Sequence, residues 1–312
     1  MNLLKETHFK NLGEQKIGKV RDIYIQPDKI ILVSTDRHSS FDRIIAHIPN
    51  KGQILNQISA FWFENTKDIV PNHLLEVPDP NVVVVKKCKV IPIEMVVRGY
   101  ITGSTNTSLW VLYKNGERDF GNFILPDGMV KNQKLEEPVL TPTTKSDEHD
   151  RPITPKEIVD EGFMTQALWD EVSDKAIKIF KRGQEIALKN GLILVDTKYE
   201  FGIDENGQVT LIDEVHTPDS SRYWQAETYQ SRIDKGEEPE NFDKEFLRLW
   251  FKEHSDPYKD TVLPEAPEEM VLELSRRYIQ IFEQITGNKF IGASETENIE
   301  ERIENNLKEF KI

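Results

Sequence analysis

Residues 191–214, GLILVDTKYEFGIDENGQVTLIDE, decide the fold of this chain. Four apolar residues, 192–195, lead into a stretch in which Asp196, Lys198 and Glu200 stand two residues apart. This spacing predicts a β-strand with the three charged side chains on one face. Asn206-Gly207 then predicts a two-residue type I′ turn into a second strand at 209–214. The stretch therefore predicts a β-hairpin with one charged face.

The predicted turn fixes which residues of the hairpin face each other. With Asn206 and Gly207 at its centre, Glu200 is expected directly opposite Asp213, at a Cβ separation of about 4.5–5.5 Å. Two carboxylates at that distance repel unless a cation lies between them. Mg²⁺ binds in this way through one or two carboxylates and substrate phosphates, and Lys198 could neutralise a phosphate oxygen. We interpret the hairpin as the floor of a Mg-nucleotide site; the alternative is an amphipathic hairpin whose charged face lies in water.

The composition restricts the classes of protein and of partner. A chain of 312 residues, 38% hydrophobic and 30% charged, indicates a soluble globular protein of one large domain or two lobes. Its net charge of −14 argues against nucleic acid and anionic membranes as partners, because both require a basic surface. Cys88 is the only cysteine and the first residues lack a signal-peptide core, so a cytoplasmic location is expected. The oligomeric state stays open, with a monomer favoured.

Strands are expected to precede most of the helices. Apolar patterns predict strands at 16–25, 29–35, 44–49 and 82–97 and a helix at 51–65. Later helices are expected at 165–189, 243–253 and 267–285, and Thr154 to Glu157 reads as a capping box. This order predicts an α+β fold of two lobes, residues 1–97 and 98–312. A cleft between lobes is the default ligand site.

Three other polar segments carry candidate chemistry. Residues 18–22, GKVRD, predict a β-turn that lays backbone N–H groups and Lys19 on phosphates, the alternative being a basic surface hairpin. Residues 34–43 could bind a small zwitterion or form an ordinary polar turn. In residues 90–104 the charges of Glu94 and Arg98 interrupt an apolar strand. Buried charges require partners, so a structural Glu94–Arg98 pair is the alternative to a binding role there.

Together these segments resemble the SAICAR synthetase family, the phosphoribosylaminoimidazole-succinocarboxamide synthases. The first family signature, an apolar pair followed by P-[apolar]-E-x-V-V-R and ending in G-S, matches residues 90–104. The second, apolar-D-x-K-x-E-F-G, matches residues 195–202. Residues 145–150 and 213–224 match as well, so the resemblance covers about residues 15 to 225. The chain looks like the longer form of the family.

The resemblance implies a two-lobed fold akin to ATP-grasp enzymes and protein kinases, with an antiparallel sheet in the N-terminal lobe and ATP between the lobes. It implies an ATP-dependent ligase that joins CAIR, a 4-carboxy-aminoimidazole ribotide, to L-aspartate in purine biosynthesis. The products are SAICAR, ADP and phosphate, and the path is phosphorylation of the CAIR carboxylate followed by attack of the aspartate amine. The implied partners are thus the small molecules ATP, CAIR and L-aspartate, with Mg²⁺ as cofactor.

The site residues that the resemblance implies are grouped by ligand. The catalytic lysines are Lys145 and Lys198. Contacts with ATP are assigned to Lys19, Val20, Arg21, Lys86, Val90, Glu94, Lys145 and Lys198. Contacts with CAIR are assigned to Arg98, Ser104, Asp150, Asp196 and Arg222. Glu200 and Asp213 would hold Mg²⁺, and Ser40 and Asp42 would bind aspartate.

Two other classes of function share some of these groups. A small-molecule or protein kinase would also use lysine and Mg²⁺, but the sequence has neither HRD nor DFG in a kinase context. A nucleotide sensor without catalytic activity would keep the ATP groups and lack a second substrate site, against which Arg98, Ser104 and Arg222 argue. Release of ADP with CAIR alone, aspartate alone and both together separates the three.

Overall fold

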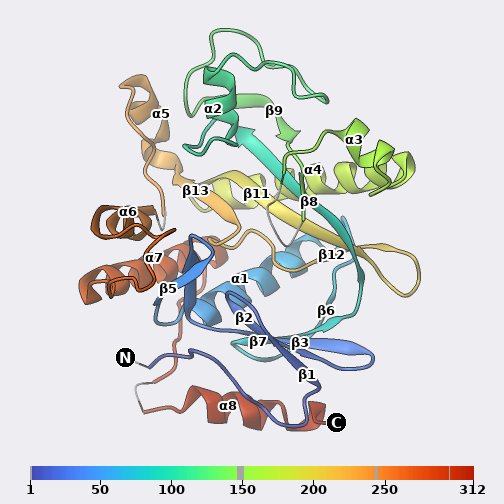
Figure 1. The fold of residues 1–312 in the computed structure, drawn as a ribbon, viewed down its shortest axis with the longest axis vertical. Helices are drawn as coiled ribbons and strands as arrows, with labels where there is room; N and C mark the ends of the chain where they lie inside the picture. Colours follow the sequence, from blue (N-terminus) through green and yellow to red (C-terminus); the bar gives the residue numbers. More distant parts are fainter. Residues whose placement is uncertain (1, 146–150, 243–244, 295) are drawn as a thin grey trace. The chain divides into compact units, whose positions relative to one another are not determined.

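The computed structural model describes residues 2–145, 151–242, 245–294 and 296–312 and has a mixed α+β fold (Figure 1). The chain forms two compact units. Unit 1 consists of residues 1–61, 73–87 and 242–312, and unit 2 of residues 62–72 and 88–241. These units divide the chain differently from the expected lobes, 1–97 and 98–312. The difference arises because strand β8 (Lys89–Tyr100) crosses the expected boundary and residues 242–312 return to unit 1.

Unit 1 is built on a five-stranded antiparallel sheet in the order β1-β2-β3-β7-β6. Its strands are β1 (Glu14–Ile17), β2 (Arg21–Ile25), β3 (Lys29–Ser34), β6 (Leu74–Asp79) and β7 (Val82–Lys86). The turn at residues 18–20 splits the expected strand 16–25 into β1 and β2. Residues 82–97, expected as one strand, belong to β7 and β8 in different sheets. A separate hairpin joins β4 (Arg37–Ser40) to β5 (Arg43–His47).

The helices of unit 1 come from both ends of the chain. Helix α1 (Lys51–Thr66) begins in unit 1, and α6 (Glu245–His254), α7 (Glu268–Thr286), α8 (Ile299–Asn306) and the 3₁₀ turn η1 (Lys308–Phe310) follow residue 242. Helix α8 packs on the sheet, where its apolar residues join those of β2, β3 and β7 in one core cluster. The expected helices at 51–65 and 267–285 are confirmed as α1 and α7, and the one at 243–253 is confirmed as α6 over its described residues. Gly287 ends α7 in the left-handed conformation.

Unit 2 is built on a six-stranded antiparallel sheet that carries most of the candidate site. The path β10-β8-β11-β12 is extended by β13, which pairs with β11, and by β9, which pairs with β8. The strands other than β8 are β9 (Lys134–Leu140), β10 (Thr143–Thr144), β11 (Leu192–Ile203), β12 (Val209–Ile212) and β13 (Ser221–Gln225). The long strands β8 and β11 lie side by side over most of their length.

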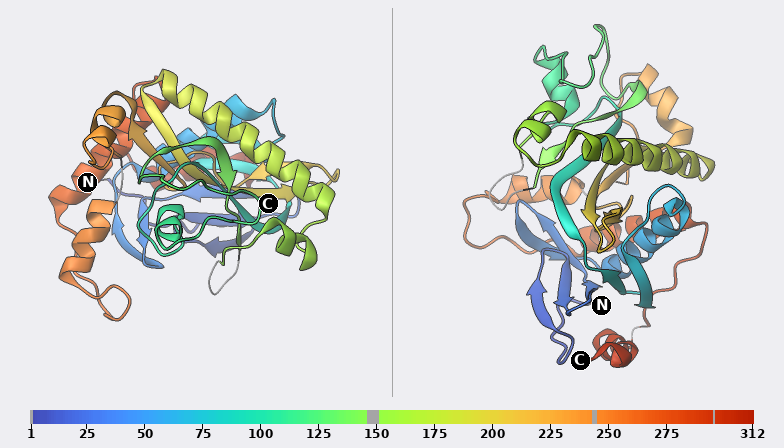
Figure 2. Two further views of the ribbon diagram at one scale, coloured as in Figure 1. Left: turned by 90° about the horizontal axis from the view of Figure 1, so that it is seen from above. Right: turned by 90° about the vertical axis from the view of Figure 1, so that its right-hand side faces the viewer.

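Helix α4 (Gln166–Lys189) covers one face of this sheet, as Figure 2 shows. Two close approaches fix it there. A Cβ on Gly99 of β8 would lie 3.1 Å from the ring of Phe180, and a Cβ on Gly183 of α4 would lie 2.3 Å from the ring of His216. Because side chains alternate along β8, Gly99 facing α4 directs Arg98 to the opposite face. The charged residues therefore lie on the face that α4 leaves open.

Some elements were not expected from the sequence. The sequence patterns predicted no helix or strand within residues 105–144, but these residues contain α2 (Leu109–Lys114) as well as β9 and β10. Helices α5 (Ala226–Asp234) and α8 were also missed. The capping box is confirmed at α3 (Pro155–Asp160), where Thr154 and Glu157 bond each other's backbone N–H. No helix in the ranges that the structure describes is both long and apolar enough to cross a bilayer.

A buried histidine lies behind the charged face, in the core between α4 and β11. His216 is fully buried, shares a hydrogen bond with the hydroxyl of Tyr199, and packs edge-on against Trp62 at 4.7 Å. Burial lowers the pKa of His216 from 6.5 to about 3. The folded chain therefore keeps this imidazole neutral across the physiological range.

The neutral state of His216 should make the stability of the folded protein depend on pH. Unfolding allows His216 to take up a proton near pH 6.5, which the folded chain refuses until about pH 3. Its contribution to stability is complete above about pH 6.5 and is lost progressively as the pH falls toward 3. In urea unfolding between pH 7 and pH 5, the wild type should lose up to about 1.4 kcal/mol more per pH unit than His216→Gln, which cannot titrate. Equal slopes for the two proteins would contradict this assignment.

Candidate active site

Three neighbouring strands place two arginines on either side of one aspartate. In the sheet register, Asp196 of β11 is opposite Arg98 of β8 on one side and Arg222 of β13 on the other. The Nη1 atoms of Arg98 and Arg222 lie 3.7 Å and 3.6 Å from Asp196 Oδ2. These distances are ion pairs rather than bidentate hydrogen bonds. Both guanidinium groups are therefore held in place without being saturated by the carboxylate.

Two carboxylates oppose each other directly four residues farther along the same two strands, on the same face. Glu200 of β11 is opposite Glu94 of β8, and both side chains are largely buried. Lys198 lies between them, with its Nζ atom 2.7 Å from Glu94 Oε1 and 3.3 Å from Glu200 Oε1. Lys145, just beyond β10, pairs with the other oxygen of Glu200. The repulsion expected of opposed carboxylates is thus offset by two lysines.

The predicted register of the hairpin was wrong by one residue. Glu200 lies opposite Ile212 and not opposite Asp213. The reason is the side chain of Asp204, which accepts hydrogen bonds from the backbone N–H groups of Asn206 and Gln208 at 2.9 Å. With Gly207 at φ +78°, these bonds close a three-residue turn in place of the two-residue type I′ turn.

Asp213 nevertheless acts on the same cluster. It follows the end of β12 and has a φ of +67°, so its backbone leaves the strand. Its negative charge is among those that raise the pKa of Lys198. The one-residue shift thus removes Asp213 from the position opposite Glu200 but leaves it within electrostatic range of the lysine that pairs with Glu200.

The charged face is not a solvated surface. Glu200 is 6% exposed and Glu94 8%, so the alternative of a hairpin with its charged face in water is wrong. Burial lowers the pKa of Lys198, but the charges of Glu200 and Glu94 outweigh it and raise the pKa above its ordinary value. Burial likewise lowers the pKa of Arg98, and Asp196 partly offsets it. The alternative Glu94–Arg98 pair is also wrong, since Glu94 pairs with Lys198 and Arg98 with Asp196.

Two threonines in this cluster were missed from the sequence. Thr141 accepts a hydrogen bond from Arg98 Nε at 2.8 Å, and Thr143 donates one to Glu94 Oε2 at 3.2 Å. Both lie in the run Thr141-Pro142-Thr143-Thr144, which has no periodicity and reads as a linker. Only the contacts with β8, the pairing of β10 and the hydrogen bond from the Thr141 N–H to the Val96 carbonyl, show that these hydroxyls orient the charged side chains.

A cavity of about 630 Å³ opens beside the charged face of unit 2. Glu94, Val96 and Arg98 form one wall, and the residues around Thr141 form another. The remaining lining mixes apolar side chains such as Leu109 and Leu140 with polar groups from residues 117–122 and 152–157. Its size is within the range of small-molecule sites.

The remaining candidates of unit 2 lie around this cluster or outside the described residues. Val90 is exposed near the start of β8. Ser104 is exposed two residues beyond Thr102, whose hydroxyl accepts a hydrogen bond from Arg222 at 3.4 Å. Asp150 falls in the segment 146–150, outside the residues that the structure describes.

The candidates of unit 1 gather at its turns and strand ends. Lys19 and Val20 form the turn between β1 and β2, and Arg21 begins β2. Ser40 and Lys86 end strands β4 and β7. Asp42, at the turn after β4, pairs with Lys19 at 2.5 Å. Unit 1 thus brings together Lys19, expected at a phosphate, and Asp42, expected at the aspartate pocket.

The carboxylates present fit a magnesium ion of one particular kind. Among the described residues, no three His, Cys, Asp or Glu side chains are grouped to form a complete metal cage. Mg²⁺ often binds instead through one or two carboxylates, with waters and phosphate oxygens completing its shell. Glu200 and Asp213, which both act on Lys198, are suited to that mode. A tightly bound structural metal is not what these residues would hold.

Comparison with known proteins decides the family. A family model described as SAICAR synthetase matches residues 14–265. The chain belongs to the SAICAR synthetase family. It is 59% identical to a phosphoribosylaminoimidazole-succinocarboxamide synthase of Legionella pneumophila (strain Paris), over 95% of each chain. It is 56% identical to the chloroplastic enzyme of Arabidopsis thaliana, over 98% of this chain and 75% of that one.

Solved SAICAR synthetase structures share the fold. The Saccharomyces cerevisiae enzyme complexed with SAICAR superposes with a TM-score of 0.79 at 33% identity, covering 92% of this chain and 99% of that one. A SAICAR synthetase in complex with ADP gives a TM-score of 0.67 at 27% identity, covering 89% of this chain and all of that one. The chain is therefore an enzyme, a ligase of purine biosynthesis, and the expected α+β fold is confirmed.

Proposed function

We propose that this ligase joins CAIR to L-aspartate with conversion of ATP to ADP and phosphate, through an acyl phosphate on the CAIR carboxylate. The observation that carries the proposal is the charged face of unit 2. In a protein of net charge −14, it holds four cationic side chains around three carboxylates, beside a cavity of ligand size. The solved relatives complexed with SAICAR and with ADP support the same reaction.

The two steps follow from the chemistry of a carboxylate. A CAIR carboxylate oxygen attacks the γ-phosphorus of ATP, and the bond to the β-phosphate oxygen breaks and releases ADP. The aspartate amine then attacks the acyl carbon, loses a proton, and expels phosphate as the amide forms. Phosphoryl transfer needs mainly positioning and neutralisation of charge. That requirement suits a face of lysines and arginines.

Each part of the face has a proposed role. Lys145 and Lys198 neutralise phosphate oxygens of ATP, and Glu94 and Val90 border the nucleotide from β8. Glu200 and Asp213 would hold Mg²⁺, which supplies charge neutralisation at the phosphates when bound. Arg98, Arg222, Asp196, Ser104 and Asp150 contact CAIR.

The residues of unit 1 and the protein as a whole complete the proposal. Lys19, Val20, Arg21 and Lys86 contact ATP, and Ser40 and Asp42 contact aspartate. A cytoplasmic location and a monomeric state remain predictions. A kinase or a nucleotide sensor is disfavoured by family membership.

Oxygen tracing tests the acyl phosphate. With ¹⁸O in the CAIR carboxylate, one labelled oxygen should appear in the phosphate released on each turnover, because the oxygen that attacks phosphorus leaves with it. Mass spectrometry of the released phosphate gives the result directly. Phosphate that stays unlabelled while SAICAR accumulates would remove the intermediate and leave direct attack by aspartate.

The proposed metal ligands give a second test. Glu200→Gln and Asp213→Asn should each lower the turnover rate by about 100-fold or more, which is ~2.7 kcal/mol of transition-state stabilisation. Both variants should fold, since Gln relieves the repulsion with Glu94 and Asn tolerates the positive φ at 213. Glu205→Gln, the same change at the exposed tip of the hairpin, is the control. Retention of more than a tenth of wild-type turnover at saturating Mg²⁺ would sink the assignment.

Arg222 gives a third test, because its guanidinium fork should matter more than its charge. Arg222→Lys should raise the Michaelis constant for CAIR by about 10-fold, or ~1.4 kcal/mol, since lysine cannot form a bidentate pair with an oxyanion. The constant for ATP should change much less. Arg182 of α4 makes a bidentate pair with Asp68, so Arg182→Lys controls for loss of an arginine fork elsewhere in unit 2. An equal rise in the Michaelis constants for ATP, aspartate and CAIR would show a structural role for Arg222 instead.

A further inference from the structure

The C-terminal helix α8 lies outside the part of the chain that the family model matches. The model ends at residue 265, and α8 occupies Ile299–Asn306. The helix buries Ile299 and Ile303 against the sheet of unit 1, where they join residues of β2, β3 and β7 in one apolar cluster. Apolar packing of this kind stabilises unit 1 but would not by itself concern the reaction. The polar residues of α8 make further contacts, with the turn between β6 and β7.

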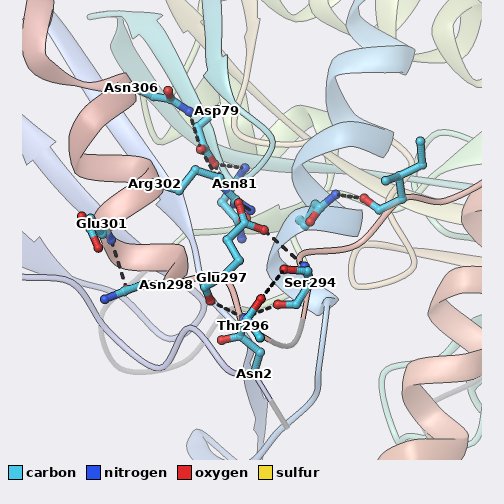
Figure 3. Close-up of polar contacts among 12 residues, drawn as sticks. Asn2, Asp79, Asn81, Ser294, Thr296, Glu297, Asn298, Glu301, Arg302 and Asn306 are labelled. Atoms are coloured by element: carbon cyan, nitrogen blue, oxygen red, sulfur yellow. Dashed lines mark hydrogen bonds and ion pairs between the residues drawn. The ribbon is translucent and has the colours of Figure 1, made fainter.

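Arg302 of α8 enters a buried polar network at the turn between β6 and β7 (Figure 3). Its Nε and Nη2 atoms donate to the two oxygens of Asp79 at 2.9 Å and 3.1 Å, and Nη2 also donates to Asn81 Oδ1 at 2.8 Å. Asn306, one turn later, donates to Asp79 at 2.8 Å. The side chain of Asp79 is fully buried, so these donors supply the partners that a buried carboxylate requires.

Asn81 carries this network to the end of strand β3. Its backbone N–H donates to Asp79 at 2.8 Å, and its side-chain amide donates to the carbonyl of Ser34 at 3.0 Å. The backbone N–H of Ser34 in turn donates to the carbonyl of Asn81 at 2.8 Å. Arg302 therefore fixes the orientation of the Asn81 amide, and that amide fixes the last residue of β3.

The residue after Ser34 holds the turn at residues 18–21. Thr35 donates twice to the carbonyl of Val20, from its backbone N–H at 2.9 Å and from its hydroxyl at 2.6 Å. Within the turn, the N–H of Gly18 donates to the carbonyl of Arg21 at 2.8 Å. Hydrogen bonds from α8 to Ser34, the peptide link from Ser34 to Thr35, and the bonds of Thr35 to Val20 thus connect α8 to this turn, entirely inside unit 1.

We propose that α8 holds the 18–21 turn in the conformation that binds nucleotide, with Arg302 as the positioning residue. This inference rests on the proposed function, in which Lys19, Val20 and Arg21 contact the phosphates of ATP. Binding to a preset turn costs less conformational entropy than binding to a mobile one. Loss of Arg302 should therefore weaken the binding of ATP and not that of the other substrates, although Arg302 itself does not contact ATP.

The experiment compares Arg302→Met with Arg276→Met in the full-length enzyme. Arg276 makes an exposed ion pair with Glu273 on α7, so its variant is the same change without the network. Arg302→Met should raise the Michaelis constant for ATP about 5-fold or more, within the range that network mutations produce, with the constants for CAIR and aspartate unchanged. Amide hydrogen exchange of residues 17–22 should become faster without ligand. Arg276→Met should match the wild type in both measurements.

Two gentler variants keep the test informative if Arg302→Met fails to fold. Arg302→Lys keeps a charge beside Asp79 but cannot bond Asp79 and Asn81 together, and should show a smaller rise in the ATP constant. Asn81→Ala removes the next side chain in the network and should raise the Michaelis constant for ATP and speed exchange at residues 17–22, as Arg302→Met does. If these folded variants show lower thermal stability but unchanged exchange at residues 17–22, the positioning role is overturned.

A companion variant separates this inference from the proposed function. Lys19→Met should raise the Michaelis constant for ATP if the turn contacts phosphates. If Lys19→Met has this effect while Arg302→Met speeds exchange and leaves the ATP constant unchanged, the link from α8 to nucleotide binding is overturned and the proposed function stands. If Lys19→Met also leaves ATP binding unchanged, the assignment of the turn to ATP fails, and the inference fails with it.

Discussion

The opposition of Glu94 and Glu200 across strands β8 and β11 is the constraint on which the site depends. Two buried carboxylates in register cannot remain charged without cations on the same face. Lys198, two residues from Glu200 on the same strand, pairs with both Glu94 and Glu200. Lys145, just after β10, pairs with the second oxygen of Glu200. The acidic pair thus holds two lysines in a protein whose net charge would otherwise repel anionic substrates.

Strand β11 also separates the charged residues on one face of the sheet from the apolar core on the other. Alternation along β11 sends Asp196, Lys198 and Glu200 to the open face and Tyr199 to the face under α4. There Tyr199 meets the neutral imidazole of His216, which lies three residues after Asp213. Positive φ angles at both Asp213 and His216 give this connection an unusual backbone, and the Tyr223 hydroxyl donates to the His216 carbonyl at 2.7 Å. The core around Tyr199 and His216, on the face of the sheet under α4, therefore contributes to the position of Asp213 beside the charged face.

The sequence predicted the parts of the site that depend on local pattern and missed those that depend on distant pairing. Alternation correctly placed three charged residues on one face of β11. The dipeptide Asn206-Gly207 correctly marked a turn, but it serves two-residue and three-residue loops alike, and the side chain of Asp204 decides between them. The register between β8 and β11 joins segments about a hundred residues apart, so no local pattern showed that the carboxylate opposite Glu200 is Glu94. The role of Thr141 in orienting Arg98 was hidden for the same reason.

Charge balance on this face also links the proposed ligands to each other. Lys198 can turn from the carboxylates to a phosphate oxygen only if Glu94 and Glu200 receive positive charge from elsewhere, since an uncompensated buried carboxylate is costly. Lys145 can supply part of that charge to Glu200 but lies close to the same phosphates under the proposed function. A nucleotide bound with a divalent cation would meet the requirement, because the cation would supply positive charge to Glu200 in place of the lysines, leaving them to pair with phosphate oxygens. A nucleotide without one leaves two negative groups facing each other. Under the proposed function, the arrangement of Glu94, Lys198 and Glu200 would couple the binding of ATP to that of Mg²⁺.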